Sequence, residues 1–178
     1  NMIEQQVRPW DVLDQRVLDT MTAVPREDFV PAAYRNIAFA DLEVPLGHGE
    51  VMMSPKVEGR LLQALEVTPE DTVLEIGTGS GYVTALLARM ARVVFSVDIH
   101  GDFTEAARAR LAEHHVRNVT LETGDAAAGW ESHGLYDVIA VTGSLSVLPD
   151  GLLRQLKDGG RLFAIVGDAP AMEAVRVV

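Results

Sequence analysis

The sequence predicts an α/β fold, with a doubly wound, mostly parallel sheet, helices on both faces and an N-terminal helical extension. Three observations predict it. From residue 72 onward, short apolar segments alternate with segments of helical periodicity, as in right-handed crossovers between parallel strands. The run 138–141 is apolar at every position, which is typical of a strand buried on both faces. A glycine-rich turn follows the first expected strand of the sheet.

The N-terminal part is expected to contain two helices and a long connection. The first helix would have Asp11 as its N-cap and end before Pro25. Its apolar stripe consists of Leu13, Val17, Met21 and Val24. Residues 31–55 show no sustained period, so an irregular connection with one short strand is expected. Ser54 and Pro55 predict the N-cap and first residue of a second helix. The buried face of that helix consists of Val57, Leu61, Leu62 and Leu65.

The remaining chain supplies the sheet and its crossover helices. Strands are expected at 72–76, 93–98, 119–122, 137–141 and 161–166. Helices are expected at 82–90, 103–115 and 152–156. Three of the last five residues, 174–178, are β-branched, and a complete sheet of this kind needs a further strand or two. The C-terminal end is therefore expected to be missing.

Composition restricts the kind of protein. With 178 residues, of which 48% are hydrophobic, the chain is long enough for one domain with a full core. A net charge of −11 would repel a polyanion, so no nucleic-acid partner is expected. Cysteine is absent and the five histidines lack metal-ligand spacing, so no metal is expected. No apolar run approaches the ~20 residues of a membrane span, and a cytoplasmic location without a membrane partner is expected.

The segment V-L-E-I-G-T-G-S-G-Y, at 73–82, predicts a ligand-binding turn. Gly77, Gly79 and Gly81 have no Cβ, so the backbone can turn tightly and approach a small molecule. A dinucleotide-binding G-x-G-x-x-G would need glycine where Tyr82 stands, which makes NAD the weaker interpretation. With Glu75 the segment becomes E-x-G-x-G-x-G, which resembles the first motif of Rossmann-type S-adenosylmethionine-dependent methyltransferases. An ordinary strand-to-helix turn is the alternative.

Two acidic residues at strand ends agree with a nucleoside ligand. Asp98 closes the second strand of the sheet, where a carboxylate can accept from both ribose hydroxyls; the alternative is a cap on the helix beginning near Asp102. Asp125 closes the third strand, where it can accept from an adenine amino group, although Gly-Asp is also a common turn. The residues expected to bind S-adenosyl-L-methionine are Glu75, Gly77, Thr78, Gly79, Gly81, Asp98, Ile99, Gly124, Asp125 and Ala126.

The resemblance extends to one family within this class. V-P-R-E-D-F-V-P at 24–31, A-D at 40–41 and P-L-G at 45–47 precede the glycine segment. Further matching segments lie at 124–125, 129–130, 136–142 and 156–162. Together these resemble the protein-L-isoaspartate O-methyltransferase family over nearly all of 2–167. The resemblance implies methyl transfer to the free carboxylate of an isoaspartyl residue in a damaged protein or peptide, which leads to a succinimide and repair.

The expected acceptor segment departs from the family pattern. The family's G-Q-T-I-S falls on 49–53, G-E-V-M-M, so Val51 and Met53 replace two hydroxyl side chains. Ser54 is a weak catalytic candidate, because its position also fits a helix N-cap. A carboxylate with a pKa near ~4 is ionised at neutral pH, so transfer to it needs alignment and no general base. Met52 and Met53 fit either a core or a pocket wall.

Two functional interpretations therefore stay open. The first is a methyltransferase of the isoaspartyl-repair type that acts on isoaspartyl proteins or on another small acceptor. The second is a protein that binds S-adenosylmethionine without transferring its methyl group, which Val51 and Met53 favour. In both, 1–178 forms one domain, with 1–66 as the helical, substrate-side segment and 72–178 as the cofactor-binding sheet.

Overall fold

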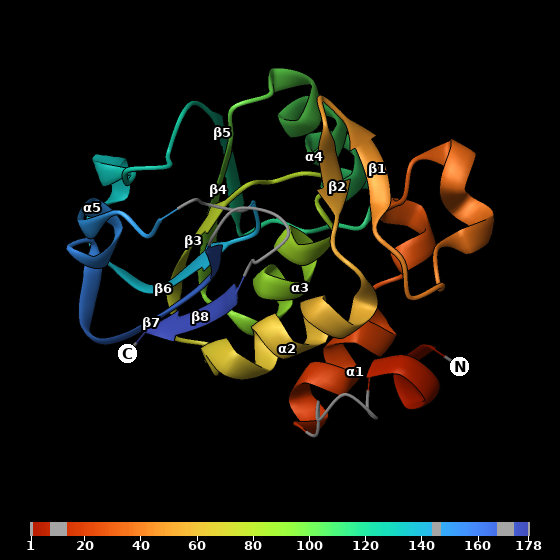
Figure 1. The fold of residues 1–178 in the computed structure, drawn as a ribbon, viewed down its shortest axis with the longest axis horizontal. Helices are drawn as coiled ribbons and strands as arrows, with labels where there is room; N and C mark the ends of the chain where they lie inside the picture. Colours follow the sequence, from red (N-terminus) through yellow and green to blue (C-terminus); the bar gives the residue numbers. More distant parts are fainter. Residues whose placement is uncertain (1, 8–13, 144–146, 167–172, 178) are drawn as a thin grey trace.

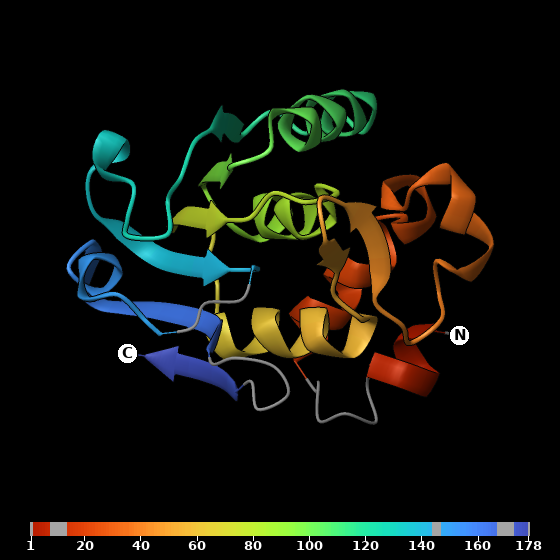
Figure 2. The same ribbon diagram turned by 45° about the horizontal axis from the view of Figure 1, so that its top comes forward.

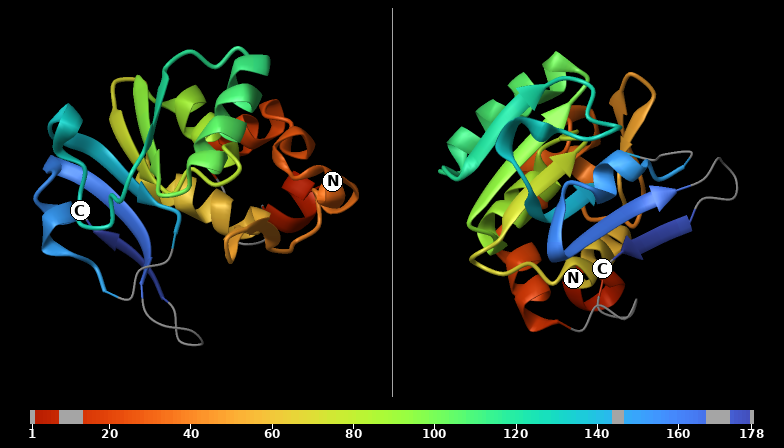
Figure 3. Two further views of the ribbon diagram at one scale, coloured as in Figure 1. Left: turned by 90° about the horizontal axis from the view of Figure 1, so that it is seen from above. Right: turned by 90° about the vertical axis from the view of Figure 1, so that its left-hand side faces the viewer.

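A six-stranded sheet forms the centre of the molecule (Figure 1). The computed structural model describes residues 2–7, 14–143, 147–166 and 173–177. The strands are β3 (Thr72–Ile76), β4 (Val93–Asp98), β5 (Val119–Thr123), β6 (Tyr136–Val141), β7 (Leu156–Val166) and β8 (Glu173–Val177). Their order is β5-β4-β3-β6-β7-β8, in which β8 alone is antiparallel to its neighbour (Figure 3). The predicted mostly parallel sheet is confirmed.

Alternate residues of the central strands pack into two separate cores. In β6, Val138 and Ala140 belong to one apolar cluster, whereas Ile139 and Val141 belong to the other. The first cluster joins the sheet to the helices α1 (Gln15–Ala23), α2 (Pro55–Leu65), α3 (Tyr82–Met90) and α4 (Gly101–Glu113). The second joins it to the short helix α5 (Asp150–Leu153). Helices therefore cover both faces, as expected for a doubly wound sheet. No helix in the described part of the chain is long and apolar enough to cross a membrane.

The first helix begins later than the sequence predicts. The N-cap of α1 is Asp14, whose carboxylate accepts from the backbone N–H of Arg16 at 2.9 Å. Asp11 is therefore not the cap of this helix, and Asp11 and Leu13 themselves lie outside the described residues. An acidic residue three positions further along forms the cap because the first helical hydrogen bonds go to its carbonyl group.

Helix α2 has the predicted start and a buried face, but its start has no side-chain cap. Ser54 occupies the N-cap position before Pro55, and its hydroxyl makes no capping hydrogen bond. The other end is closed by Arg161 of β7, whose guanidinium donates to the carbonyl oxygens of Leu65 and Glu66 at 2.8 Å each. The same guanidinium pairs with Asp71, just before β3, so Arg161 anchors the end of α2 to the sheet.

The connection 31–55 contains two strands, so the expectation of one short strand is wrong. β1 (Val44–Gly47) and β2 (Glu50–Met52) form an antiparallel hairpin. Before it come the 3₁₀ helices η3 (Arg26–Phe29) and η4 (Ala32–Ile37), and a short helix, η1 (Ile3–Val7), precedes α1. Strands of four and three residues are too short to show a period of two in sequence.

Several other boundaries shift by a few residues. α4 begins and ends two residues before the predicted helix 103–115, and α5 begins two residues before the predicted 152–156. β7 starts at Leu156, which pairs with Tyr136, although its register is irregular before Arg161. A Cβ on Gly160 would lie 3.0 Å from the Asp137 carbonyl oxygen, so the glycine lets the two strands stay close where no apolar pattern predicted a strand.

Candidate functional site

The carboxyl ends of the parallel strands meet beside the β1–β2 hairpin. The chain leaves β3 toward β4 and returns to β6 on the other side of β3, which makes the β3–β6 pair the topological switch point. The strands end level, since Ile76 pairs with both Val97 and Val141. Figure 2 shows the arrowheads of β3 and β6 directed toward the hairpin. Ligands of open α/β sheets bind at such an edge.

The three glycines after β3 meet different neighbours. All three have positive φ, at +102° for Gly77, +54° for Gly79 and +87° for Gly81. A Cβ on Gly77 would lie 2.6 Å from Thr142 Oγ1, and one on Gly81 would lie 3.0 Å from the Cβ of Ala107. Gly77 and Gly81 are thus required by contacts within the protein. A Cβ on Gly79 would meet only the end of a hairpin leucine side chain, at 3.3 Å, which leaves this glycine facing the hairpin.

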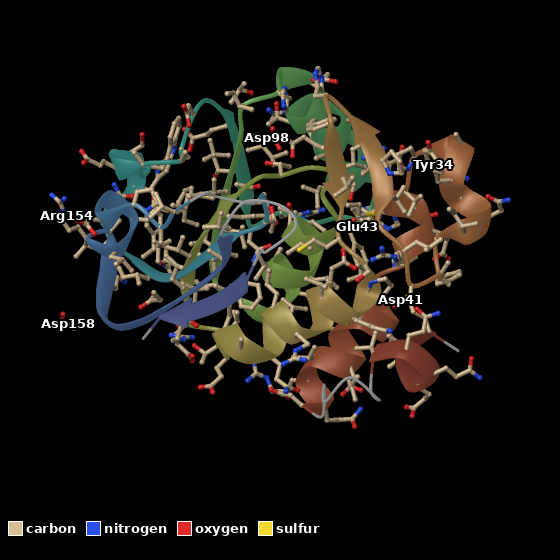
Figure 4. The ribbon with its side chains drawn as sticks, in the orientation of Figure 1. Tyr34, Asp41, Glu43, Asp98, Arg154 and Asp158 are labelled. Carbon is tan, nitrogen blue, oxygen red and sulfur yellow. The ribbon has the colours of Figure 1, made fainter. Side chains whose placement is uncertain are left out.

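Asp98 connects the glycine loop to helix α4. Its side chain is 7% exposed. Its Oδ2 accepts from the backbone N–H of Gly79 at 3.0 Å, and its Oδ1 accepts from that of His100, the N-cap residue of α4, at 2.9 Å. The role at the helix start is therefore observed, and each carboxylate oxygen keeps a second lone pair for a ligand hydroxyl. In Figure 4 Asp98 lies on the hairpin side of the sheet, far from Arg154 and Asp158.

Six of the ten predicted cofactor residues line one cavity of about 160 Å³. They are Gly77, Asp98, Ile99, Gly124, Asp125 and Ala126. Ile99 is 62% exposed and presents an apolar surface to the cavity, and the Asp125 carboxylate is also exposed. Glu50 and His100 line the same cavity, and the sequence analysis missed both. Glu50 comes from the hairpin, which no sequence pattern placed here.

Three of the other four predicted cofactor residues line a smaller hollow of about 40 Å³, which shares Gly77 with the first. Gly77 lines both spaces, and Glu75, Thr78 and Gly79 line the smaller one. The Thr78 hydroxyl shares a 2.7 Å hydrogen bond with the buried Ser96, which fixes the orientation of this side chain. Gly81 and Ser54 are not among the residues that line either space. Their assignments to the site stay predictions.

The acceptor segment lines this smaller hollow as well. Val51 is 45% exposed, Met53 is buried, and both contribute to the walls. Met52 is also buried and lines the hollow, and its sulfur accepts from the Ser80 hydroxyl at 3.7 Å. The two methionines are therefore core residues and wall residues at once. The segment that departs from the family pattern lies directly against the glycine loop.

Glu75 lies under the loop as a buried acid with one oxygen unpaired. Its Oε1 accepts from the hydroxyls of Thr84 and Ser96, the latter at 2.7 Å. Its Oε2 is buried without a hydrogen-bond partner, and burial raises the pKa of Glu75 to about 8. An unpaired carboxyl oxygen on the wall of the smaller hollow fits a cationic group, and S-adenosylmethionine carries an ammonium and a sulfonium.

Histidines of this chain lie close to carboxylates that are distant in sequence. The pairs are His48–Asp102 at 3.0 Å, His100–Glu50 at 4.0 Å, His114–Asp28 at 3.3 Å and His133–Glu122 at 2.5 Å. The sequence does not show these pairs, because the partners come from other elements of the structure. Within the described ranges, no group of three or more His, Cys, Asp or Glu side chains is placed to hold a metal ion.

The switch-point glycine loop and the acidic ends of the next two strands define a Rossmann-type S-adenosylmethionine-dependent methyltransferase. The chain belongs to the protein-L-isoaspartate(D-aspartate) O-methyltransferase (PCMT) family, whose model matches residues 1–177. The predicted family, enzyme class and cofactor are confirmed.

Two bacterial relatives illustrate the similarity. Protein-L-isoaspartate O-methyltransferase 1 of Anaeromyxobacter sp. (strain Fw109-5) is 41% identical over 177 residues, which are 99% of this chain and 84% of the relative. The protein-L-isoaspartate O-methyltransferase of Vibrio parahaemolyticus is 42% identical over 158 residues, which are 89% of this chain and 76% of the relative.

Solved structures agree with the fold. A protein-L-isoaspartate O-methyltransferase superposes with a TM-score of 0.79 at 25% identity, over 95% of this chain and 56% of that one. A Plasmodium falciparum structure described as a beta-aspartate methyltransferase, in complex with S-adenosyl-L-homocysteine, also has a TM-score of 0.79. It is 20% identical, over 98% of this chain and 87% of that one, so it supports the fold.

Proposed function

We propose that this protein transfers a methyl group from S-adenosylmethionine to the free carboxylate of isoaspartyl residues in damaged proteins or peptides. One observation carries the proposal beyond family membership. The acceptor segment and the glycine loop share one hollow, lined by Val51 and Met53 on one side and by Gly77 and Gly79 on the other. A carboxylate held by this segment would therefore lie beside the predicted cofactor site.

In this proposal, residues at the strand ends hold the nucleoside part of the cofactor. Asp98 accepts from the ribose hydroxyls, Asp125 accepts from the adenine amino group, and Ile99 packs against the ring; that all three line one cavity supports these roles. The unpaired oxygen of Glu75 lies where a cationic group would be stabilised. When bound, S-adenosylmethionine supplies an electrophilic methyl group on a sulfonium.

Methyl transfer to a carboxylate does not require a general base among the side chains of the site. Because the acceptor carboxylate is already ionised at neutral pH, no residue has to remove a proton from it. The acceptor segment has to hold the carboxylate in line and keep water away. The apolar side chains of Val51 and Met53 suit the second task, and backbone groups of the same segment are available for the first.

The test is a tritiated-methyl transfer assay with two peptides that differ only in an isoaspartyl or a normal aspartyl linkage. We expect base-labile label in the isoaspartyl peptide alone, since a methyl ester hydrolyses in base. Equal labelling of both peptides would contradict the isoaspartyl preference. Cofactor binding measured by calorimetry, with no label in either peptide, would favour the binding protein without transfer activity.

The same proposal covers partners and location. It names a damaged protein or peptide as the partner and a cytoplasmic site of action, and it includes no nucleic-acid or membrane partner. The net charge of −11 supports the exclusion of polyanions, because the field around the molecule repels them.

A further inference from the structure

Arg26 is a buried cation that lies close to the acceptor segment. Its side chain is 1% exposed, and three of its nitrogens have partners in three different segments. Nε donates to the carbonyl oxygen of Ala38 at 2.6 Å, and Nη2 donates to that of Met53 at 3.1 Å. Nη1 donates to Glu58 Oε1, so that Arg26 and Glu58 of α2 form a buried ion pair. In the sequence, Arg26 is visible only as one residue of the family motif at 24–31.

The same guanidinium reaches the helix that follows the glycine loop. Its central carbon lies 5.0 Å from the ring centroid of Tyr82, the first residue of α3, which directly follows Gly81. A cation over an aromatic face is attracted to it, more strongly where both are desolvated. Arg26 therefore contacts the acceptor segment through Met53 and the cofactor side of the site through Tyr82.

One oxygen of Glu58 takes no part in the ion pair, and Glu58 lies beside the acceptor segment. Its Oε2 is buried without a hydrogen-bond partner, and Glu58 lines the same hollow as Glu75, Met53 and Gly79. Burial raises the pKa of Glu58 to about 7 although the Arg26 guanidinium lowers it. Glu58 thus forms part of the wall of this hollow, and Arg26 connects it to the carbonyl group of Met53.

We propose that Arg26, held by Glu58, is a positioning residue for methyl transfer. It fixes the Met53 carbonyl, and with it residues 50–53, relative to the glycine loop. The proposal rests on the proposed function. Because Arg26 does not line the cavity of Asp98 and Asp125, its loss should impair use of the acceptor and leave cofactor affinity nearly unchanged.

The chain contains a matched control for this arginine. Arg161 also donates to two backbone carbonyl groups and pairs with one carboxylate, but it does so at the far end of α2. A lysine at either position keeps the charge and removes the planar fork of donors. Arg26→Lys and Arg161→Lys therefore make equivalent chemical changes at the two ends of one helix.

The experiment measures kcat and KM for the isoaspartyl peptide and the Kd of S-adenosylhomocysteine in both variants, at a temperature where circular dichroism shows both folded. We expect Arg26→Lys to lower kcat/KM roughly ten- to hundredfold with Kd changed less than about threefold. Arg161→Lys should lower the melting temperature with kcat/KM within about threefold of the wild type. Glu58→Gln, which keeps the side-chain volume, should reproduce part of the Arg26→Lys loss.

Three results would overturn the inference, and they are distinguishable. Equal losses in the two lysine variants, or a normal kcat/KM in Arg26→Lys, would mean that the buried pair only stabilises the fold. A wild-type protein that binds S-adenosylhomocysteine but labels no peptide would refute the proposed function itself, and the positioning role with it.

Discussion

The three glycines of the loop after β3 differ in what a side chain at each position would meet. Gly77 and Gly81 are required by Thr142 and Ala107, which a Cβ would meet at 2.6 Å and 3.0 Å. Gly79 is different, since it faces the hairpin and a hollow. Substitution at this position is therefore the clearest test of where the cofactor binds.

We expect Gly79→Val to abolish binding of S-adenosylhomocysteine in calorimetry, because a branched side chain would enter the space beside the loop. Asp98→Ala should weaken binding by about 1.5–3 kcal/mol through lost bonds to the ribose. Gly134→Val is the control, since Gly134 also has positive φ, +82°, but no atom within 4 Å of the added Cβ. Unchanged affinity in both site variants would contradict this placement of the cofactor.

A second prediction concerns the two lost hydroxyls. Val51→Thr combined with Met53→Ser should raise kcat/KM for the isoaspartyl peptide, at most roughly a hundredfold if the restored bonds contribute ~3 kcal/mol together. Met52→Ser is the control, because it removes a buried methionine of the same segment without restoring a family hydroxyl. High wild-type activity with no gain in the double variant would show that Ser54 or backbone amides hold the carboxylate.

The buried carboxyl of Glu75 predicts a dependence of stability on pH. Folding raises its pKa from 4.5 to about 8, so the folded state binds the proton more tightly than the unfolded state. The resulting stability is complete below the unfolded pKa and is lost as the pH rises through the folded one. The unfolding free energy of the wild type should fall between about pH 5 and pH 8.5. In Glu75→Gln this fall should be smaller by on the order of 3 kcal/mol.

Chemical denaturation at several pH values measures this effect. Glu105→Gln, at an exposed position of α4, serves as the control and should follow the wild-type profile. Glu58 titrates in all three proteins, because burial raises its pKa as well, so the comparison isolates Glu75. Parallel profiles for wild type and Glu75→Gln would mean that Glu75 stays ionised in the folded protein.

Among the elements, the β1–β2 hairpin does most to assemble the site. Its sides contact the glycine loop through Leu46 and Met52, while its turn reaches the start of α4. His48, in the turn at φ +54°, stacks on His100 with ring centroids 4.0 Å apart, and its Nε2 lies 3.0 Å from the Asp102 carboxylate. The hydrogen bond to His48 lowers the pKa of Asp102. The hairpin is thus attached on both sides of the cofactor cavity.

We expect His48→Gly to free the hairpin without unfolding the protein. The variant loses the ring stacking and an exposed hydrogen bond to Asp102, and it gains a residue suited to positive φ, so its free energy of unfolding should stay close to that of the wild type. The backbone amides of 46–51 should exchange hydrogen faster. His133→Ala is the control, because His133 also stacks on an aromatic ring and pairs with a carboxylate, but away from the hairpin. Unchanged exchange would mean that the glycine-loop contacts alone hold the hairpin.

At the scale of the whole molecule, charge should influence which acceptors arrive. The net charge of −11 attracts basic peptides and repels acidic ones over distances of about one Debye length, ~10 Å at 0.1 M salt and ~3 Å at 1 M. Isoaspartyl peptides flanked by lysine should therefore show KM values about three- to tenfold lower than those flanked by glutamate at low salt. The difference should vanish near 1 M salt. A salt-independent ratio would indicate direct contacts to the flanking residues instead.

From the sequence alone, five of the six strands of the sheet, the family and six residues of the cavity at the strand ends could be predicted. Apolar runs and their interruptions are local, so they located the strand ends at Ile76, Asp98 and Val141, and parallel strands bring those ends together. The bounds of α3, 82–90, were predicted correctly because a glycine turn precedes an uninterrupted helical pattern. The division into 1–66 and 72–178, and a missing C-terminal end, stay predictions.

Which residues of distant segments contact one another depends on the tertiary structure. Arg26 lies 32 residues from Glu58 and His48 lies 54 from Asp102, and no local period records such pairs. The hairpin strands are too short for a pattern, and their contacts with the glycine loop place Val51 and Met53 on the wall of the site. Burial likewise depends on the whole fold, which is why the sequence could not show that the pKa of Glu75 is raised to about 8 beneath the loop. Local periodicity specifies elements, whereas the register and packing of those elements specify the site.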